Sequence, residues 1–171
     1  MKTTLIIVLV AILILGGIYG IKWIRVFIAT DYYEMLTALY TNSVPLIKGN
    51  EIKKMEDWVI LDVRANNEYD VSHIKGALWL GYPETDYTKL EDVPKNQMIL
   101  VYCSVGYRSE RVGEALLKKG YMNVKNLYGG IFEWVNCKKT IVDSEEKETD
   151  KIHGFDPSWG KWLNSEMTIV Y

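Results

Sequence analysis

The sequence predicts an α/β fold with a mostly parallel central sheet flanked by helices, preceded by a transmembrane helix. The apolar runs at 58–63 (WVILDV) and 98–103 (MILVYC) have no polar face, which is typical of strands buried on both sides. Helical spacing at 109–120 alternates with these strands and indicates parallel connections. Residues 5–21 form a run of 17 residues without a charge, which predicts the membrane helix.

The elements of the α/β part follow one another in a regular order. Short β-branched or apolar runs predict strands, and polar or glycine residues at their ends predict turns. The expected elements are a strand at 43–47, a helix at 51–55 capped by Asn50, strands at 58–63, 77–80 and 98–103, a helix at 109–120 stopped by Gly120, and a strand at 123–130 ending in a glycine turn.

The apolar run near the N-terminus is long enough to cross a bilayer. Residues 5–21 would rise roughly 26 Å as a helix, and flanking residues would complete a hydrocarbon core of about 30 Å. A buried core helix and a cleaved signal peptide are the alternatives. Tyr19 and Trp23 suit the membrane interface. Lys22 and Arg25 balance the positive charge on the other flank, so we predict a single-pass membrane protein without assigning its side.

The sequence divides into four segments by composition. Apolar residues at three- and four-residue spacing after the anchor predict an amphipathic helix. The C-terminal part first becomes acidic and then regains aromatic residues, so we expect it to pack on the domain. The predicted segments are the anchor at 1–30, a juxtamembrane helix at 31–42, the α/β domain at 43–137, and an acidic loop with an aromatic extension at 138–171.

Charge and cysteine usage exclude several classes of protein. The net charge of −2 gives no general attraction to nucleic acid, and we predict no such partner. Two cysteines are too few for a disulfide framework. Two cysteines and two histidines without zinc spacing predict neither a metal nor a cofactor.

The segment CSVGYRSERV places Cys103 at the carboxyl end of a buried strand, before a short loop and a helix. In open α/β sheets, ligands bind at this position. Amide groups of residues 104–108, the helix N-terminus and the charges of Arg108 and Arg111 would favour the nucleophilic thiolate and hold a persulfide sulfur. Gly106 gives the loop backbone angles closed to other residues. The alternative is a buried cysteine that acts only as a small apolar side chain.

Four motifs in this order resemble the rhodanese-like domain family. The cysteine loop has the form C-x-x-G-x-R, and the other motifs are D-x-R with E-Y, H-I-x-G-A, and G-Y-x-N-V with G-G-x-x-x-W. The matching residues are Cys103, Gly106 and Arg108; Asp62, Arg64, Glu68 and Tyr69; His73, Ile74, Gly76 and Ala77; and Gly120, Tyr121, Asn123, Val124, Gly129, Gly130 and Trp134. The resemblance covers residues 44–135, roughly half of the chain.

The resemblance implies a sulfurtransferase or persulfide carrier. Cys103 would be catalytic, taking sulfur from a small donor such as thiosulfate and passing it to cyanide or a thiol acceptor, including a protein thiol. Arg108 would hold an anionic donor. The predicted substrate-binding residues are Arg108, Ser104, Val105, Gly106, Tyr107 and Ser109.

A second group of residues is predicted to shape the site rather than to touch substrate. Asp62 and Arg64 lie at a strand end, where they can bond loop backbone or each other. Glu68 is expected to pair with Arg64, and His73 is expected to fix a turn by hydrogen bonding.

The sequence leaves three alternatives to sulfur transfer, which are a phosphatase, a binding module and a thiol redox protein. Related phosphatase loops hold five residues between cysteine and arginine, and this loop holds four, which suits a sulfur atom better than a phosphate. The domain could instead be a non-catalytic binding module tethered to a membrane. A thiol redox protein using Cys103 and Cys137 is the third alternative.

Overall fold

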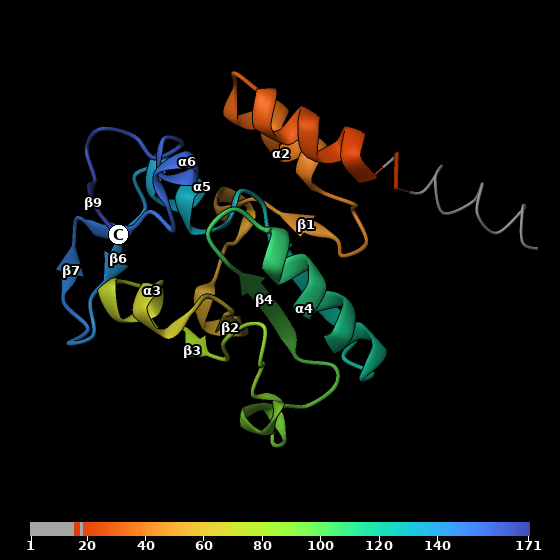
Figure 1. Ribbon diagram of the computed structural model, residues 1–171. Coiled ribbons are helices and arrows are strands. Elements are labelled where there is room, and N and C mark those ends of the chain that lie inside the picture. The colour runs from red at the N-terminus through yellow and green to blue at the C-terminus, as the bar shows by residue number, and fades with distance from the viewer. Residues whose placement is uncertain (1–15, 18) are drawn as a thin grey trace, which may run out of the picture. The chain divides into compact units, whose positions relative to one another are not determined.

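The computed structural model describes residues 16–17 and 19–171 and divides the chain into two compact units, Met1–Thr41 and Asn42–Tyr171 (Figure 1). In the smaller unit, residues 19–28 are helical and α2 spans Tyr32–Leu39. The Asp31 carboxylate caps α2 by accepting the amides of Tyr33 and Glu34 at 2.9 and 3.1 Å. This cap starts a new helix, so residues 19–28 and α2 are two separate helices rather than one.

The predicted anchor at 5–21 lies mostly outside the described residues, which begin at 16 and omit 18. Within the described part of the chain, we find no helix long and apolar enough to cross a bilayer.

The larger unit is built on a five-stranded parallel sheet. Every neighbouring pair of strands runs parallel, in the order β1-β5-β4-β2-β3. The strands are β1 (Leu46–Ile47), β2 (Trp58–Asp62), β3 (Leu78–Trp79), β4 (Met98–Tyr102) and β5 (Asn123–Leu127). All five predicted strands are confirmed, each with shorter bounds. The carboxyl ends of parallel strands meet at one edge, and β4 occupies the middle of it.

Three helices pack around the sheet: α3 (Asn66–Val71), α4 (Tyr107–Lys118) and α5 (Gly130–Asn136). Figure 1 shows α4 running along β4, which it contacts. The helix predicted at 109–120 is confirmed, and Gly120 follows its end with a φ of 89°. Both α3 and α5 were missed, because short helices of six and seven residues give little periodicity.

The helix predicted at 51–55 is wrong. The chain forms two short 3₁₀ turns there, Gly49–Glu51 and Met55–Asp57, separated by an extended Ile52. A five-residue helix must fix its first turn for very few hydrogen bonds, so the segment adopts isolated turns.

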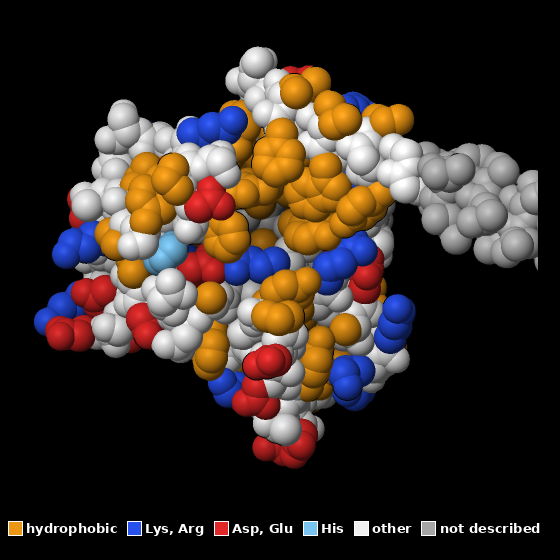
Figure 2. Space-filling view, in the orientation of Figure 1, with side chains coloured by type: hydrophobic (Ala, Val, Ile, Leu, Met, Phe, Trp, Pro, Cys, Tyr) orange, Lys and Arg blue, Asp and Glu red, His pale blue; other side chains and the backbone are white. Residues whose placement is uncertain are grey.

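The C-terminal extension packs on the domain, as expected. It contains β6 (Ile141–Val142) and β7 (Glu148–Thr149), which form a hairpin, then β8 (Lys151–His153), α6 (Pro157–Gly160) and β9 (Thr168–Val170). Strand β8 pairs in parallel with β9 and contacts α3. The acidic stretch is therefore a hairpin with short strands, not a plain loop. On the face drawn in Figure 2, acidic and basic side chains lie interspersed over the larger unit.

A buried ion pair closes the end of β2. The Arg64 Nη2 atom lies 2.6 Å from Asp62 Oδ2, and both side chains are fully buried. Arg64 also donates Nη2 to the Ser72 carbonyl at 2.6 Å. The pair therefore ties the carboxyl end of β2 to the chain that follows α3, beside the edge that carries Cys103.

We predict that Asp62→Ala destabilises the domain strongly, because it leaves the Arg64 guanidinium buried without its counter-charge. Breaking a buried pair in this way costs about 3–5 kcal/mol. Urea unfolding followed by circular dichroism measures the loss. Asp57→Ala removes an exposed acid beside the same strand and should change stability by less than about 0.5 kcal/mol. Equal losses in the two variants would contradict the role of the pair.

Candidate active site

Cys103 lies immediately after β4, at the middle of the sheet edge where the parallel strands end. The side chain is 1% exposed. Its Sγ atom accepts the amide hydrogen of Gly106, with a nitrogen–sulfur distance of 3.2 Å. Gly106 is the residue before α4 and has a φ of 102°, a left-handed value that favours glycine. This turn therefore brings the chain back over the sulfur before the helix begins.

The N-terminus of α5 supports the loop from behind. Ile131 donates its amide to the Cys103 carbonyl at 2.9 Å, and Phe132 donates its amide to the Ser104 carbonyl at 3.1 Å. A Cβ atom on Gly130 would lie 2.3 Å from the Cys103 carbonyl oxygen, a contact that real Cβ atoms do not make. The double glycine of the sequence motif thus allows α5 to approach the cysteine loop closely.

Arg108 is held by an acid rather than left open to a ligand. Its Nη1 and Nη2 atoms lie 2.6 and 2.7 Å from the two carboxylate oxygens of Glu68. Ser104 Oγ joins both, at 2.9 Å from Glu68 Oε1 and 2.9 Å from Arg108 Nη2. The ring of Phe155, from the C-terminal extension, lies 5.1 Å from the Arg108 guanidinium carbon. This group of three side chains links α3, the cysteine loop and α4.

This arrangement corrects one prediction about ion pairing. Glu68 was expected to pair with Arg64, but its carboxylate binds Arg108, while Arg64 binds Asp62. Two separate buried pairs satisfy two cations, whereas one shared acid would leave a buried charge uncompensated.

The Glu68–Arg108 pair shifts the ionisation of both groups. Burial alone would raise the pKa of Glu68, but the hydrogen bonds and charge of Arg108 outweigh it, so this pKa lies below 4.5. Burial alone would lower the pKa of Arg108, but Glu68 raises it. Both groups are therefore charged at neutral pH.

Ser109 lies behind the sulfur, with its Oγ 3.5 Å from Cys103 Sγ. The same hydroxyl lies 2.8 Å from Oδ1 of Asn126 on β5. Asn126 donates its Nδ2 to the Gly106 carbonyl at 2.9 Å and is fully buried. The sequence reasoning missed Asn126. The available signal was an amide inside a predicted strand, beside the buried Leu127, because buried polar groups need partners.

The other predicted loop residues have different surroundings. Val105 is buried and Tyr107 is half-buried. Arg111 lies 3.0 Å from both Glu110 and Glu114, so its charge is compensated within α4.

The contacts of His73 hold neighbouring segments of the chain together and do not involve the Cys103 sulfur. Its ring stacks on Tyr69 at 4.0 Å between centroids, and its Nε2 lies 3.2 Å from Glu146 Oε1. Its backbone forms a bridge with Val142. His73 thus joins the end of α3 to the C-terminal extension, in keeping with a structural role.

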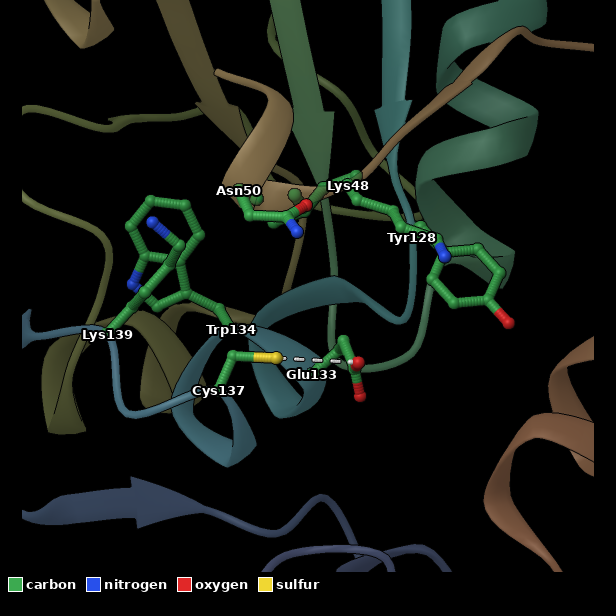
Figure 3. Close-up of a pocket in the computed structure, with 9 residues that line it drawn as sticks. Lys48, Asn50, Tyr128, Glu133, Trp134, Cys137 and Lys139 are labelled. Atoms are coloured by element: carbon green, nitrogen blue, oxygen red, sulfur yellow. Dashed lines mark hydrogen bonds between the residues drawn. The ribbon is translucent and has the colours of Figure 1, made fainter. Parts of the chain in front are cut away.

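Cys137 lies at the far end of α5, beside a pocket of about 470 Å³ (Figure 3). Its Sγ points at Glu133 Oε1, 3.5 Å away, and partial burial and this acid raise the thiol pKa. Ile131, which binds Cys103, is six residues earlier, about 9 Å along the helix axis. Because a disulfide needs Cα atoms within about 7 Å, direct Cys103–Cys137 pairing would require α5 to move.

Comparison with known proteins assigns the class. The model of the rhodanese-like domain matches residues 48–137, more than half of the chain. The chain therefore belongs to the rhodanese-like domain family.

Two bacterial relatives share part of the sequence. A tRNA uridine(34) hydroxylase of Staphylococcus haemolyticus is 38% identical over 86 residues, covering 44% of this chain and 25% of that protein. A tRNA uridine(34) hydroxylase of Bacillus thuringiensis is 34% identical over 91 residues, covering 47% of this chain and 27% of that protein. The chain spans about a quarter of the length of these relatives.

Solved structures share the fold. A rhodanese-like domain from an Anabaena sp. protein has a TM-score of 0.53 at 22% identity, covering 58% of this chain and 79% of that one. The thiosulfate sulfurtransferase from Pseudomonas aeruginosa has a TM-score of 0.53 at 23% identity, covering 58% of this chain and 20% of that one. At these identities the likeness shows the fold alone.

We predict that Glu68→Gln lowers stability at neutral pH by an amount that shrinks in acid. The folded-state pKa of Glu68 is depressed, so its contribution is fully present above the unfolded value of about 4.5 and is lost as the pH falls through the folded value. Urea unfolding between about pH 7 and pH 3 measures the difference from wild type. Exposed Glu91→Gln is the control, and a pH-independent difference for Glu68→Gln would contradict the assignment.

Proposed function

We propose that the domain is a sulfurtransferase or persulfide carrier in which Cys103 holds the transferred sulfur. The observation that carries the proposal is the loop after β4. It points the Gly106 amide at Cys103 Sγ and is fixed from behind by the amides of Ile131 and Phe132. An amide hydrogen aimed at Sγ stabilises the negative charge of the thiolate, which is the form of Cys103 that attacks the donor and is released when the acceptor takes the sulfur.

The proposed reaction has two displacement steps. The Cys103 thiolate attacks the outer sulfur of the donor, so a Cys103 S–S bond forms and the donor's S–S bond breaks with its electron pair leaving on the donor. With thiosulfate, the leaving group is sulfite. An acceptor thiolate or cyanide then attacks the outer sulfur and releases the Cys103 thiolate. No external oxidant or reductant is needed, because the sulfane sulfur is only exchanged.

The contacts of Arg108 bear on the identity of the donor. Both of its terminal nitrogens are bound by Glu68, and the pair is largely buried. Recruiting Arg108 to an anion would break this pair, and the loop side chains of Ser104 and Val105 add no charge. We therefore infer that Arg108 positions the loop, and that a small persulfide with a single negative charge serves as donor better than doubly charged thiosulfate does.

The two relatives share only one part of their length with this chain. The two hydroxylases are matched over about a quarter of their length, and their reaction on tRNA is not part of what we propose for this chain.

The first test measures sulfur on Cys103 directly. After treatment with a low-molecular-weight persulfide, and separately with thiosulfate, intact-mass analysis of the 171-residue chain should show one added sulfur. Cys103→Ser should lose it and Cys137→Ser should keep it. Thiocyanate production from thiosulfate and cyanide should fall to background in Cys103→Ser. A chain that takes up no sulfur from either donor would instead favour the binding-module hypothesis.

We also propose that residues 5–21 anchor the domain to a membrane. The support is the length of this uncharged run and the aromatic residues near its C-terminal end, Tyr19 within the run and Trp23 just after it.

A reporter fused after Tyr171 tests the anchor and its orientation. The wild-type chain should sediment with membranes and resist alkaline carbonate extraction, and reporter activity should identify the side. Replacing Leu9 and Leu13 by arginine should release the chain, because a cation in the bilayer core costs about 3 kcal/mol. Release of the wild-type chain by carbonate would contradict a transmembrane anchor.

A further inference from the structure

The hydrogen bonds behind Cys103 run in a fixed direction. Asn126 lies between the Gly106 carbonyl, 2.9 Å from Nδ2, and the Ser109 hydroxyl, 2.8 Å from Oδ1. A carbonyl accepts only, so the amide nitrogen must face Gly106 and the amide oxygen must face Ser109. The orientation of the Asn126 side chain follows from its partners.

That orientation decides where the Ser109 proton goes. A hydroxyl has one proton, and the Asn126 Oδ1 atom can only accept it. Ser109 Oγ therefore turns a lone pair toward Cys103 Sγ, 3.5 Å away. A lone pair accepts the hydrogen of a thiol but gives no stabilisation to a thiolate. In contrast, the Gly106 amide at 3.2 Å favours the unprotonated sulfur.

We propose that Asn126 is a positioning residue that restrains the reactivity of Cys103 by keeping the hydrogen of the Ser109 hydroxyl directed away from the sulfur. With Asn126 in place, Ser109 favours the protonated thiol at rest. When Cys103 loses its proton or carries a second sulfur, Sγ bears no hydrogen for Ser109 to accept. Ser109 then either loses this contact or gives up its bond to Asn126. This role of Asn126 rests on the proposed function only in what it implies for sulfur transfer.

The charged surroundings of the sulfur do not depend on Asn126. Arg108 is the cation that acts on Cys103, and Glu68 binds it, while Arg64 is paired with Asp62. The ionisable side chains on the elements around the site include Arg108, Glu110, Arg111, Glu114 and Lys118 on α4, Glu68 and Asp70 on α3, Asp62 and Arg64 at the end of β2, Tyr102 on β4, Lys125 on β5, Glu133 on α5 and His153 in the extension. A neutral substitution at Asn126 leaves all of these charges in place.

The structure also indicates that Asn126 can be replaced without orphaning the Gly106 carbonyl. That carbonyl accepts the Glu110 amide at 3.1 Å, as part of the first turn of α4. Asn126→Leu keeps a side chain of similar shape and removes both polar contacts. The Ser109 hydroxyl is then free to rotate and donate to Cys103 Sγ.

The test is the pH titration of the Cys103 thiolate, followed by its ultraviolet absorbance in a Cys137→Ser background. Each variant is corrected with the same variant carrying Cys103→Ser, which removes the tyrosine signal. Asn126→Leu should move the titration midpoint to lower pH by about half a unit or more, the scale of one hydrogen bond. Asn126→Asp keeps an acceptor for Ser109 and adds negative charge, so its midpoint should rise.

Ser109→Ala decides the direction of the hydrogen bond and does not depend on the folding of any Asn126 variant. If Ser109 accepts from the thiol, its removal lowers the midpoint, and if it donates to the thiolate, its removal raises the midpoint. A rise in Ser109→Ala would overturn the proposal. So would an Asn126→Leu shift of equal size with and without Ser109. Neither result depends on sulfur uptake, so failure of the proposed function would be seen separately in the mass measurement.

Discussion

The paired contact between Glu68 and Arg108 is the interaction on which the site depends. Both terminal nitrogens of the guanidinium meet both carboxylate oxygens, and Ser104 joins the pair from inside the cysteine loop. Three segments distant in sequence are thus fixed to one another: α3, the loop and α4. Because the pair is largely buried, loss of either partner would leave a charge without compensation, so the loop geometry and the stability of the domain are linked.

Around this pair, backbone contacts determine the shape of the cysteine loop. The parallel sheet brings the end of β4 to the middle of one edge, and the N-terminus of α5 binds the carbonyls of Cys103 and Ser104. With those carbonyls turned backward, the amide of Gly106 turns toward Sγ. The loop therefore offers the sulfur a hydrogen-bond donor that needs no side-chain charge. An arginine that positions the loop, rather than one that binds an anion, is compatible with this design.

The site also contains opposing influences on the same sulfur. The Gly106 amide favours the unprotonated atom, while the Ser109 hydroxyl, held by Asn126, presents a lone pair to it. A carrier must accept sulfur and release it again, so a moderate nucleophile serves both steps better than an extreme one. The C-terminal extension lies beside the same region, since Phe155 covers Arg108 and β8 contacts α3.

The sequence by itself determined the α/β class, the five strands, α4 and the position of Cys103, because buried parallel strands and glycine-bounded loops leave strong local patterns. It did not determine α3, α5 or the absence of a helix at 51–55, where short segments give weak periodicity. Only the tertiary structure decided that Glu68 binds Arg108 rather than Arg64, and that Asn126 orients Ser109. Those partners lie 40 and 17 residues apart. Which buried donor meets which acceptor depends on how the strands and helices pack, and no local pattern records it.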